Sequence, residues 1–183
     1  MANLIILEGL SRTGKSTITK TLSEKLGLKN ISLAVKKPEG IENLPDFYHG
    51  IHVISNEFYK EFKDETFILD RSFLSELVYS KFFERNSHLT KESINDIIES
   101  NNVVLFFLNN DYDGYIERGP KEDIPFTEND FSKQKAAFEW NFSSYKNLNE
   151  KTKLSFIEID TTKLDLDKSI DKIETHLKTL KFI

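Results

Sequence analysis

A phosphate-binding motif stands near the start of the chain. Residues 9–16 read Gly, four residues of any type, Gly, Lys and Ser, which is the spacing of a phosphate-binding loop, or P-loop. Gly9 and Gly14 allow the backbone to bend so that successive N–H groups point at one anion. Lys15 can reach the β- and γ-phosphates of a nucleoside triphosphate, and the Ser16 hydroxyl can bind Mg²⁺. The motif therefore predicts phosphate binding together with Mg²⁺.

The residues on either side of the loop support this interpretation. Residues 4–7 are apolar and predict a buried strand, while residues 17–26 predict a helix that ends at Gly27. A strand before and a helix after are the context that separates a P-loop from a chance match, and the positive end of the helix dipole favours a bound anion. We expect Glu8, just before the loop, to accept hydrogen bonds from N–H or hydroxyl groups of the loop rather than to act as a base.

Polar residues also follow two further predicted strands. Asp70 and Arg71 come directly after residues 66–69, which predict a strand, and Lys36 comes after a second predicted strand at residues 31–35. Asp70 could hold Mg²⁺ through water or orient an acceptor, but it could also cap a helix or pair with a cation. Arg71 could grip the phosphate of an acceptor with its planar guanidinium, or it could pair with a carboxylate at the surface. Lys36 could face the same ligand-binding cleft as Asp70 and Arg71, or it could remain a solvated charge.

Predicted strands alternate with predicted helices along the whole chain. Besides the segments named above, strands are expected at residues 103–108 and 154–159. Further helices are expected at residues 46–62, from Ser72 to Phe83, at 90–100, 112–118 and 167–180, and over about twenty residues that include the core candidates Phe131, Phe138, Trp140 and Phe142. Ser72 can cap the helix that follows it. This alternation predicts an α/β fold, a parallel sheet covered on both faces, in one domain over residues 1–183. Ligands of such sheets bind beyond the carboxyl ends of the strands, where the polar motifs lie.

The composition limits the other function classes. The chain has 183 residues, 38% hydrophobic and 30% charged, with fifteen Phe and a net charge of −5. A negative chain offers no general basic surface, so neither nucleic acid nor a membrane is expected as a partner. Cysteine is absent, which excludes disulfides and thiol-bound metals and suits the cytoplasm. The first apolar run is too short for a signal peptide, and no stretch could span a bilayer.

The sequence resembles the thymidylate kinase family of P-loop nucleotide kinases. Residues 7–17 resemble the family's E-G-x-D-x-x-G-K-S/T-T opening, and residues 70–80 resemble D-R-Y-x-x-S-x-x-A-Y-Q without a gap. Residues 36–38 stand where the family has R-x-P, and residues 159–161 are similar to I-D-A in its last strand. The resemblance implies the three-layer α-β-α P-loop NTPase fold, with a five-stranded parallel sheet in the order 2-3-1-4-5 and a short lid at about residues 119–128.

The resemblance also implies a role for each candidate site residue. ATP would contact the P-loop and the arginine before the lid, that is Gly9, Ser11, Arg12, Thr13, Gly14, Lys15, Ser16, Thr17 and Arg118. Ser16 and Asp70 would hold Mg²⁺, and the catalytic residues would be Lys15, Arg12, Asp70 and Arg71. The acceptor would contact Lys36, Pro38, His52, Arg71, Ser75 and Tyr79. Arg12 corresponds to a transition-state arginine in the P-loop, in agreement with a lid that contains no Arg. The His52 ring could stack on a base, although core packing or surface exposure is the simpler interpretation.

Several positions depart from the family pattern. The Asp that contacts the sugar 3′-hydroxyl is Ser11 here, the Gln that reads thymine is Ser80, and the expected Tyr is Ser72. Lys36 replaces an Arg, which exchanges a bidentate grip for a point charge. We therefore expect ATP-dependent phosphoryl transfer to a deoxynucleoside monophosphate, dTMP or a related pyrimidine nucleotide, which yields the diphosphate.

Two other functions remain open. Deoxynucleoside kinases carry an E-R-S-x-x-S segment that also resembles residues 70–75, and Glu39 could supply the general base that a nucleoside hydroxyl needs, whereas Lys36 favours a monophosphate. The second alternative is a P-loop protein that binds ATP without kinase activity. A GTPase is disfavoured because Asp70 does not begin a D-x-x-G motif and N-K-x-D is absent. The resemblance also leaves open a homodimer through residues 46–62.

Overall fold

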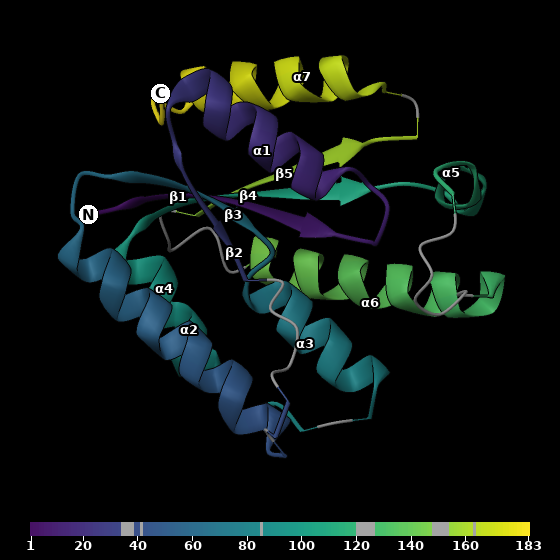
Figure 1. The fold of residues 1–183 in the computed structure, drawn as a ribbon, viewed down its shortest axis with the longest axis horizontal. Helices are drawn as coiled ribbons and strands as arrows, with labels where there is room; N and C mark the ends of the chain where they lie inside the picture. Colours follow the sequence, from purple (N-terminus) through teal and green to yellow (C-terminus); the bar gives the residue numbers. More distant parts are fainter. Residues whose placement is uncertain (34–38, 41, 85, 120–126, 148–153, 163) are drawn as a thin grey trace.

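The chain folds into a five-stranded sheet with helices on both faces (Figure 1). The computed structural model describes residues 1–33, 39–40, 42–84, 86–119, 127–147, 154–162 and 164–183. All strand pairs are parallel, and the order is β2-β3-β1-β4-β5. Helices α1 and α7 cover one face, and α2, α3, α4 and α6 cover the other. This three-layer α/β arrangement confirms the expected fold class and strand order.

The elements begin and end close to the expected positions. The strands are β1 (Asn3–Gly9), β2 (Lys29–Ser32), β3 (Thr66–Asp70), β4 (Asn102–Asn109) and β5 (Leu154–Asp160). The helices are α1 (Lys15–Leu26), α2 (Leu44–Glu61), α3 (Phe73–Phe82), α4 (Lys91–Ser100), α5 (Tyr112–Glu117), α6 (Glu128–Asn147) and α7 (Leu166–Thr179). The expected second strand, residues 31–35, begins earlier, at Lys29, and residues 34–35 lie outside the described part of the chain.

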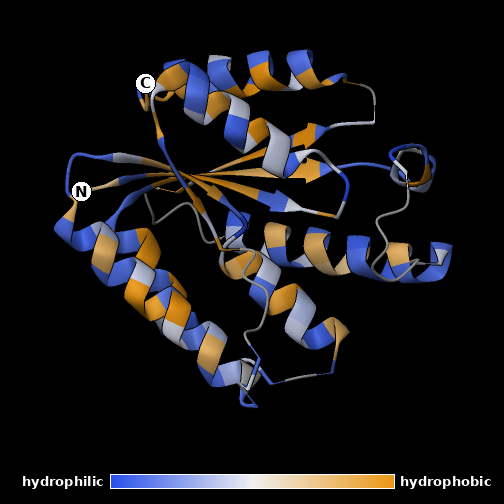
Figure 2. Cartoon of the chain, in the orientation of Figure 1, coloured by the Kyte–Doolittle hydropathy of each residue, from blue (hydrophilic) through white to orange (hydrophobic). Residues whose placement is uncertain are grey.

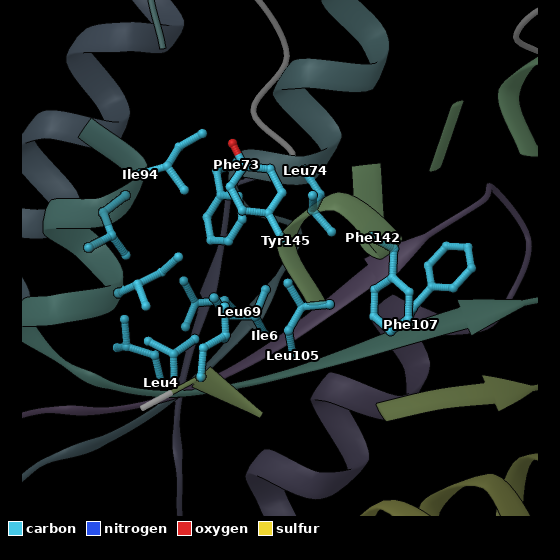
Figure 3. Packing of buried hydrophobic residues seen from close by; sticks show 14 of the residues in the cluster. Leu4, Ile6, Leu69, Phe73, Leu74, Ile94, Leu105, Phe107, Phe142 and Tyr145 are labelled. Atoms are coloured by element: carbon cyan, nitrogen blue, oxygen red, sulfur yellow. The ribbon is translucent and has the colours of Figure 1, made fainter. Parts of the chain in front are cut away.

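The central strands are apolar on both faces because helices cover both sides of the sheet. Leu4 and Ile6 belong to a core with α3, α4 and α6, whereas Ile5 and Leu7 belong to a second core with α1 and α7. Successive side chains of a strand point to opposite faces, so an uninterrupted apolar strand supplies both cores. Figure 2 shows apolar residues along the strands and on the helix faces that meet them. Figure 3 shows Phe73, Phe107, Phe142 and Tyr145 packed among the aliphatic residues of the larger core.

One expected core residue lies at the surface. Phe131, Phe138 and Phe142 of α6 are buried, but Trp140 is 66% exposed. Residue 140 is two positions from both Phe138 and Phe142, which turns its side chain about 200° around the helix axis from each of them. The prediction that Trp140 belongs to the core was therefore wrong. Among the helices of the described segments, none is both long enough and apolar enough to cross a membrane.

The strand register brings distant segments to one edge of the sheet. Leu7 of β1 pairs with Asp70 of β3, Gly9 pairs with Leu108 of β4, and Asn109 of β4 pairs with Asp160 of β5. The residues that follow these positions are the P-loop, Arg71 and the segment after β5. Because the carboxyl ends of parallel strands share one edge, these segments are neighbours in space.

Candidate functional site

The P-loop joins β1 to α1 and contains two glycines that no other residue could replace without strain. Gly9 has a φ of 130°, and a Cβ atom there would lie 2.1 Å from the carbonyl oxygen of Leu108. Gly14 has a φ of 86° and immediately precedes α1. Both glycines lie in the part of φ space that side chains disfavour, so the chain bends as the motif predicts. The loop N–H groups and the N-terminus of α1 can therefore face one anion.

Lys15 is folded back over this loop. Its ammonium group donates to the carbonyl oxygen of Leu10 and, at 3.0 Å, to Oγ1 of Thr13. The residue is only 4% exposed. A fixed cation thus lies inside the loop that is shaped for an anion, and phosphate oxygens are stronger partners for an ammonium group than neutral carbonyls are.

Ser16 and Asp70 come together at the start of α1. The Ser16 hydroxyl donates to Oδ2 of Asp70 at 2.5 Å, and Asp70 is 5% exposed. Oδ1 of Asp70 is buried and has no hydrogen-bond partner among the residues that the structure describes. A hydroxyl and a carboxylate with a free oxygen fit Mg²⁺, which takes few ligands from a protein and completes its shell with phosphate and water. The described segments contain no group of three His, Cys, Asp or Glu residues that could hold a metal by themselves.

Arg71 lies beside the same loop. Its Nη1 donates to the carbonyl oxygen of Gly9 at 3.3 Å and to Oγ of Ser75 at 3.0 Å. Its guanidinium lies 5.2 Å from the centroid of the Tyr79 ring. The structure therefore brings together three of the residues expected at the acceptor, Arg71, Ser75 and Tyr79, and joins them to the P-loop.

Glu8 differs from expectation in its partners. Its side chain is fully buried, and Oε1 accepts from the N–H groups of Ser72 at 2.6 Å and Ser75 at 3.2 Å. Oε2 accepts from the Ser75 hydroxyl at 2.5 Å. Burial raises the pKa of Glu8, while the Ser75 hydrogen bonds and the charge of Arg71 oppose this shift. Glu8 therefore binds the start of α3 and not groups of the P-loop.

Ser72 does not cap α3 with its own side chain. It occupies the N-cap position, but its hydroxyl makes no capping hydrogen bond. The carboxylate of Glu8 takes that place from the neighbouring strand, where it also complements the positive end of the helix dipole. The expectation that Ser72 could cap the helix was wrong, because the Glu8 carboxylate on β1 already binds the N–H group of Ser75, which a capping side chain at residue 72 would use.

Two further arginines lie at the loop: Arg12 belongs to it and Arg118 contacts it. Nη1 of Arg12 donates to the carbonyl oxygen of Tyr115 at 3.1 Å, and its guanidinium lies 4.2 Å from the Tyr115 ring centroid. Arg118 donates to the carbonyl oxygens of Arg12 at 2.7 Å and Thr161 at 2.6 Å. Arg118 thereby joins the P-loop to the segment after β5, while Arg12 rests against α5.

A cavity of about 280 Å³ opens beside this arginine. Sequence reasoning identified four of its lining residues, Thr13, Gly14, Thr17 and Arg118, and missed the other six, Ile18, Thr161, Leu164, Asp165, Leu166 and Ser169. The available signal for the missed residues was position, because they follow the last strand or lie on the helix after the P-loop. The cavity combines apolar walls with hydroxyl and carboxylate groups next to the loop.

Some expected site residues lie elsewhere. His52 is buried and lines a separate cavity of about 80 Å³ with Asn56 of α2 and with Ser93 and Asp96 of α4. The structure does not join His52 to the residues around the P-loop. Lys36, Pro38 and most of the expected lid lie outside the described residues. Ser80 is buried, and its hydroxyl donates to the carbonyl oxygen of Leu77 at 3.1 Å.

Comparisons with known proteins place the chain by its fold. No protein-family model matches the sequence, and no curated protein matches it. Among solved structures, the chain is similar to the YorR protein of Bacillus subtilis in complex with phosphorylated GDP, with 21% identity, 98% of each chain covered and a TM-score of 0.72. It is also similar to deoxyadenosine kinase from M. mycoides with dCMP and dCDP, with 18% identity, 97% of this chain and 99% of that chain covered, and a TM-score of 0.61. Thymidylate kinase from Candida albicans matches with 18% identity, 97% and 92% coverage and a TM-score of 0.61. These similarities show the fold that P-loop kinases share.

Proposed function

We propose that this protein transfers a phosphoryl group from ATP to a deoxynucleoside monophosphate, with dTMP or a related pyrimidine nucleotide as the acceptor. The observation that carries the proposal is the arrangement of Lys15, the Ser16–Asp70 pair and Arg71 around one P-loop. Phosphoryl transfer depends on positioning and on positive charge around the moving group, and these residues supply both. Full-length similarity to nucleotide and nucleoside kinases supports the same reaction class.

The donor would bind along the loop and the adjoining cavity. The loop N–H groups and Lys15 would hold the β- and γ-phosphates, while Ser16 and Asp70 would hold Mg²⁺. Bound Mg²⁺ neutralises phosphate charge in this class of reaction. The cavity beside Arg118 has the apolar and polar walls that an adenosine moiety needs, so we assign the base and ribose of ATP to it.

The acceptor would bind on the side of Arg71. Its guanidinium can grip a phosphate by two parallel hydrogen bonds, and Tyr79 offers an aromatic face nearby. A monophosphate is itself the nucleophile, whereas a nucleoside hydroxyl needs a general base. Two carboxylates act on Arg71: Glu8 binds the start of α3 with both oxygens, and Asp70 binds Ser16 with Oδ2, which leaves Oδ1 for Mg²⁺. Lys36, the cation that the sequence places after the expected second strand, agrees with a phosphate as the ligand.

A substrate panel tests the proposal. Purified protein is incubated with Mg-ATP and, in separate reactions, dTMP, dUMP, modified dUMPs, dCMP and thymidine, and the products are resolved by anion-exchange chromatography. We expect a diphosphate from at least one pyrimidine monophosphate and little product from thymidine. Equal or faster phosphorylation of thymidine would make the protein a deoxynucleoside kinase, an alternative kept open by the E-R-S-x-x-S likeness and Glu39. Absence of transfer to any acceptor would leave a P-loop protein that only binds ATP.

A further inference from the structure

Arg71 has an unfavourable backbone conformation. Its φ is 73°, in the left-handed region that a residue with a side chain rarely adopts. Such a conformation persists only when the surrounding structure holds it. The N–H group of Arg71 donates to Leu7 of β1 at 3.0 Å, and the next N–H group, that of Ser72, donates to Glu8 at 2.6 Å. Two successive residues of β1 therefore hold the backbone around Arg71.

The side chain of Arg71 is tied to the same carboxylate through Ser75. A guanidinium carries only donors and a carboxylate only acceptors, whereas a hydroxyl has one proton to give and lone pairs to receive another. Ser75 Oγ must therefore accept from Nη1 of Arg71, at 3.0 Å, and donate its proton to Oε2 of Glu8, at 2.5 Å. This order gives the Ser75 hydroxyl one donor and one acceptor as partners, which fixes its orientation. The carboxylate is fully buried, so water does not compete for these bonds.

We propose that Glu8 is a positioning residue for Arg71, which it holds at the P-loop through the Ser75 hydroxyl and the Ser72 backbone. The phosphate-gripping role of Arg71 rests on the proposed function, but the positioning itself does not. Oε1 of Glu8 binds the backbone at the start of α3, and Oε2 binds the hydroxyl that receives Arg71. The two oxygens thus have separable tasks, a helix cap and a relay to the arginine.

Glu8→Gln separates these two tasks. The amide keeps an oxygen that can accept from the N–H groups of Ser72 and Ser75, so the cap on α3 remains. Its NH₂ group cannot accept the Ser75 proton, so the relay to Arg71 is broken. Ser75→Ala breaks the same relay from its other end and leaves the two backbone hydrogen bonds of Glu8 in place. The matched control is Glu65→Gln, which changes a half-exposed carboxylate that pairs with Lys29 at the surface.

The first readout is the arginine side chain itself. The sequence contains four arginines, Arg12, Arg71, Arg85 and Arg118, so a ¹H–¹⁵N spectrum of the arginine Nε–H groups holds few signals, and Arg71→Lys assigns one of them. We expect Glu8→Gln and Ser75→Ala each to shift and broaden the Arg71 signal while the Arg12 and Arg118 signals stay in place. Glu65→Gln should leave all of them unchanged. An unmoved Arg71 signal in both relay variants overturns the proposal.

The second readout is kinetic, with dTMP as the probe and Mg-ATP as the donor. Misplacing a positioning group by about 1 Å can cost on the order of a hundredfold in rate, so we expect Glu8→Gln to lower kcat/KM for dTMP roughly 10- to 100-fold with KM for ATP unchanged. In an Arg71→Ala background the same change should have no further effect, because the arginine it acts through is gone. Additive losses, or a lowered Tm with unchanged kcat/KM, would show that Glu8 only caps α3.

The two proposals fail in different ways. If the Arg71 signal moves in the relay variants but no monophosphate is phosphorylated by the unaltered protein, the positioning stands and the proposed function is wrong. If dTMP is phosphorylated and neither the signal nor kcat/KM responds to Glu8→Gln and Ser75→Ala, the function stands and the positioning is wrong.

Discussion

The cations at the P-loop differ in what holds them. Lys15 is almost fully buried and bonds to oxygens of the loop itself, whereas Arg12 points to the adjacent helix and bonds to the carbonyl oxygen of Tyr115. These oxygens are all neutral, and a phosphate can replace them with stronger charge-assisted hydrogen bonds. Lys15 therefore needs little movement to meet a phosphate held by the loop, and Arg12 needs to exchange its partner on α5.

Removal of either cation should cost transition-state stabilisation. We expect Lys15→Ala and Arg12→Ala each to lower kcat at least roughly a hundredfold, as losses of preorganised electrostatic groups do. The measurement is steady-state transfer from Mg-ATP to dTMP, with Tm recorded to verify folding. Lys20→Ala, which removes an exposed lysine from the same helix α1, is the control and should retain kcat. Near-normal turnover in the Arg12 variant would refute its assigned role.

At the scale of the element, the sequence predicts helices better than it predicts what begins them. The apolar spacing predicted α3 and α4 close to their observed positions, and Thr90 caps α4 as its type suggests. The start of α3 could not be predicted in the same way, because its acceptor comes from Glu8, sixty-four residues before Ser72. A local sequence pattern shows only partners that are near in the sequence, so the residues around Ser72 do not indicate a cap that comes from Glu8 on β1.

The two helix starts predict losses of different size for the same kind of substitution. Thr90 accepts from the N–H group of Ser93 at 3.2 Å, whereas the Ser72 hydroxyl makes no capping bond. We expect Thr90→Ala to lower the free energy of unfolding by about 1 kcal/mol and Ser72→Ala to lower it by clearly less. Urea unfolding followed by circular dichroism measures both. Equal losses in the two variants would mean that the Ser72 hydroxyl stabilises α3 after all.

At the scale of the whole molecule, the parallel sheet determines which parts of the site can be predicted from the sequence. A parallel sheet brings the residues after its strands to one edge, so the meeting of the P-loop with Asp70 and Arg71 followed from strand order alone. The cavity beside Arg118 did not follow from strand order, because its shape depends on how α1 packs against α7 and against the segment before α7. The orientation of His52 could not be predicted either, since periodicity gives a buried face of α2 but not the helix that covers it.

That packing of α2 on α4 couples the stability of the molecule to pH. Burial, and secondly the nearby His49, lowers the pKa of His52 to about 4, in a cavity that Glu57 and Asp96 also line. The unfolded chain binds this proton with a pKa near 6.5, so the stabilisation is complete above about pH 6.5 and is lost as the pH falls towards 4.

We therefore expect the free energy of unfolding to fall by up to roughly 3 kcal/mol between pH 7 and pH 4 because of His52. Urea unfolding at several pH values in this range measures the loss. His52→Gln, which cannot bind a proton there, should flatten this part of the profile, whereas His176→Gln, on a helix that does not border the cavity, serves as the control. A profile as steep in His52→Gln as in the unaltered protein would mean that other groups set the acid sensitivity, and that the α2–α4 contact tolerates a charged imidazole.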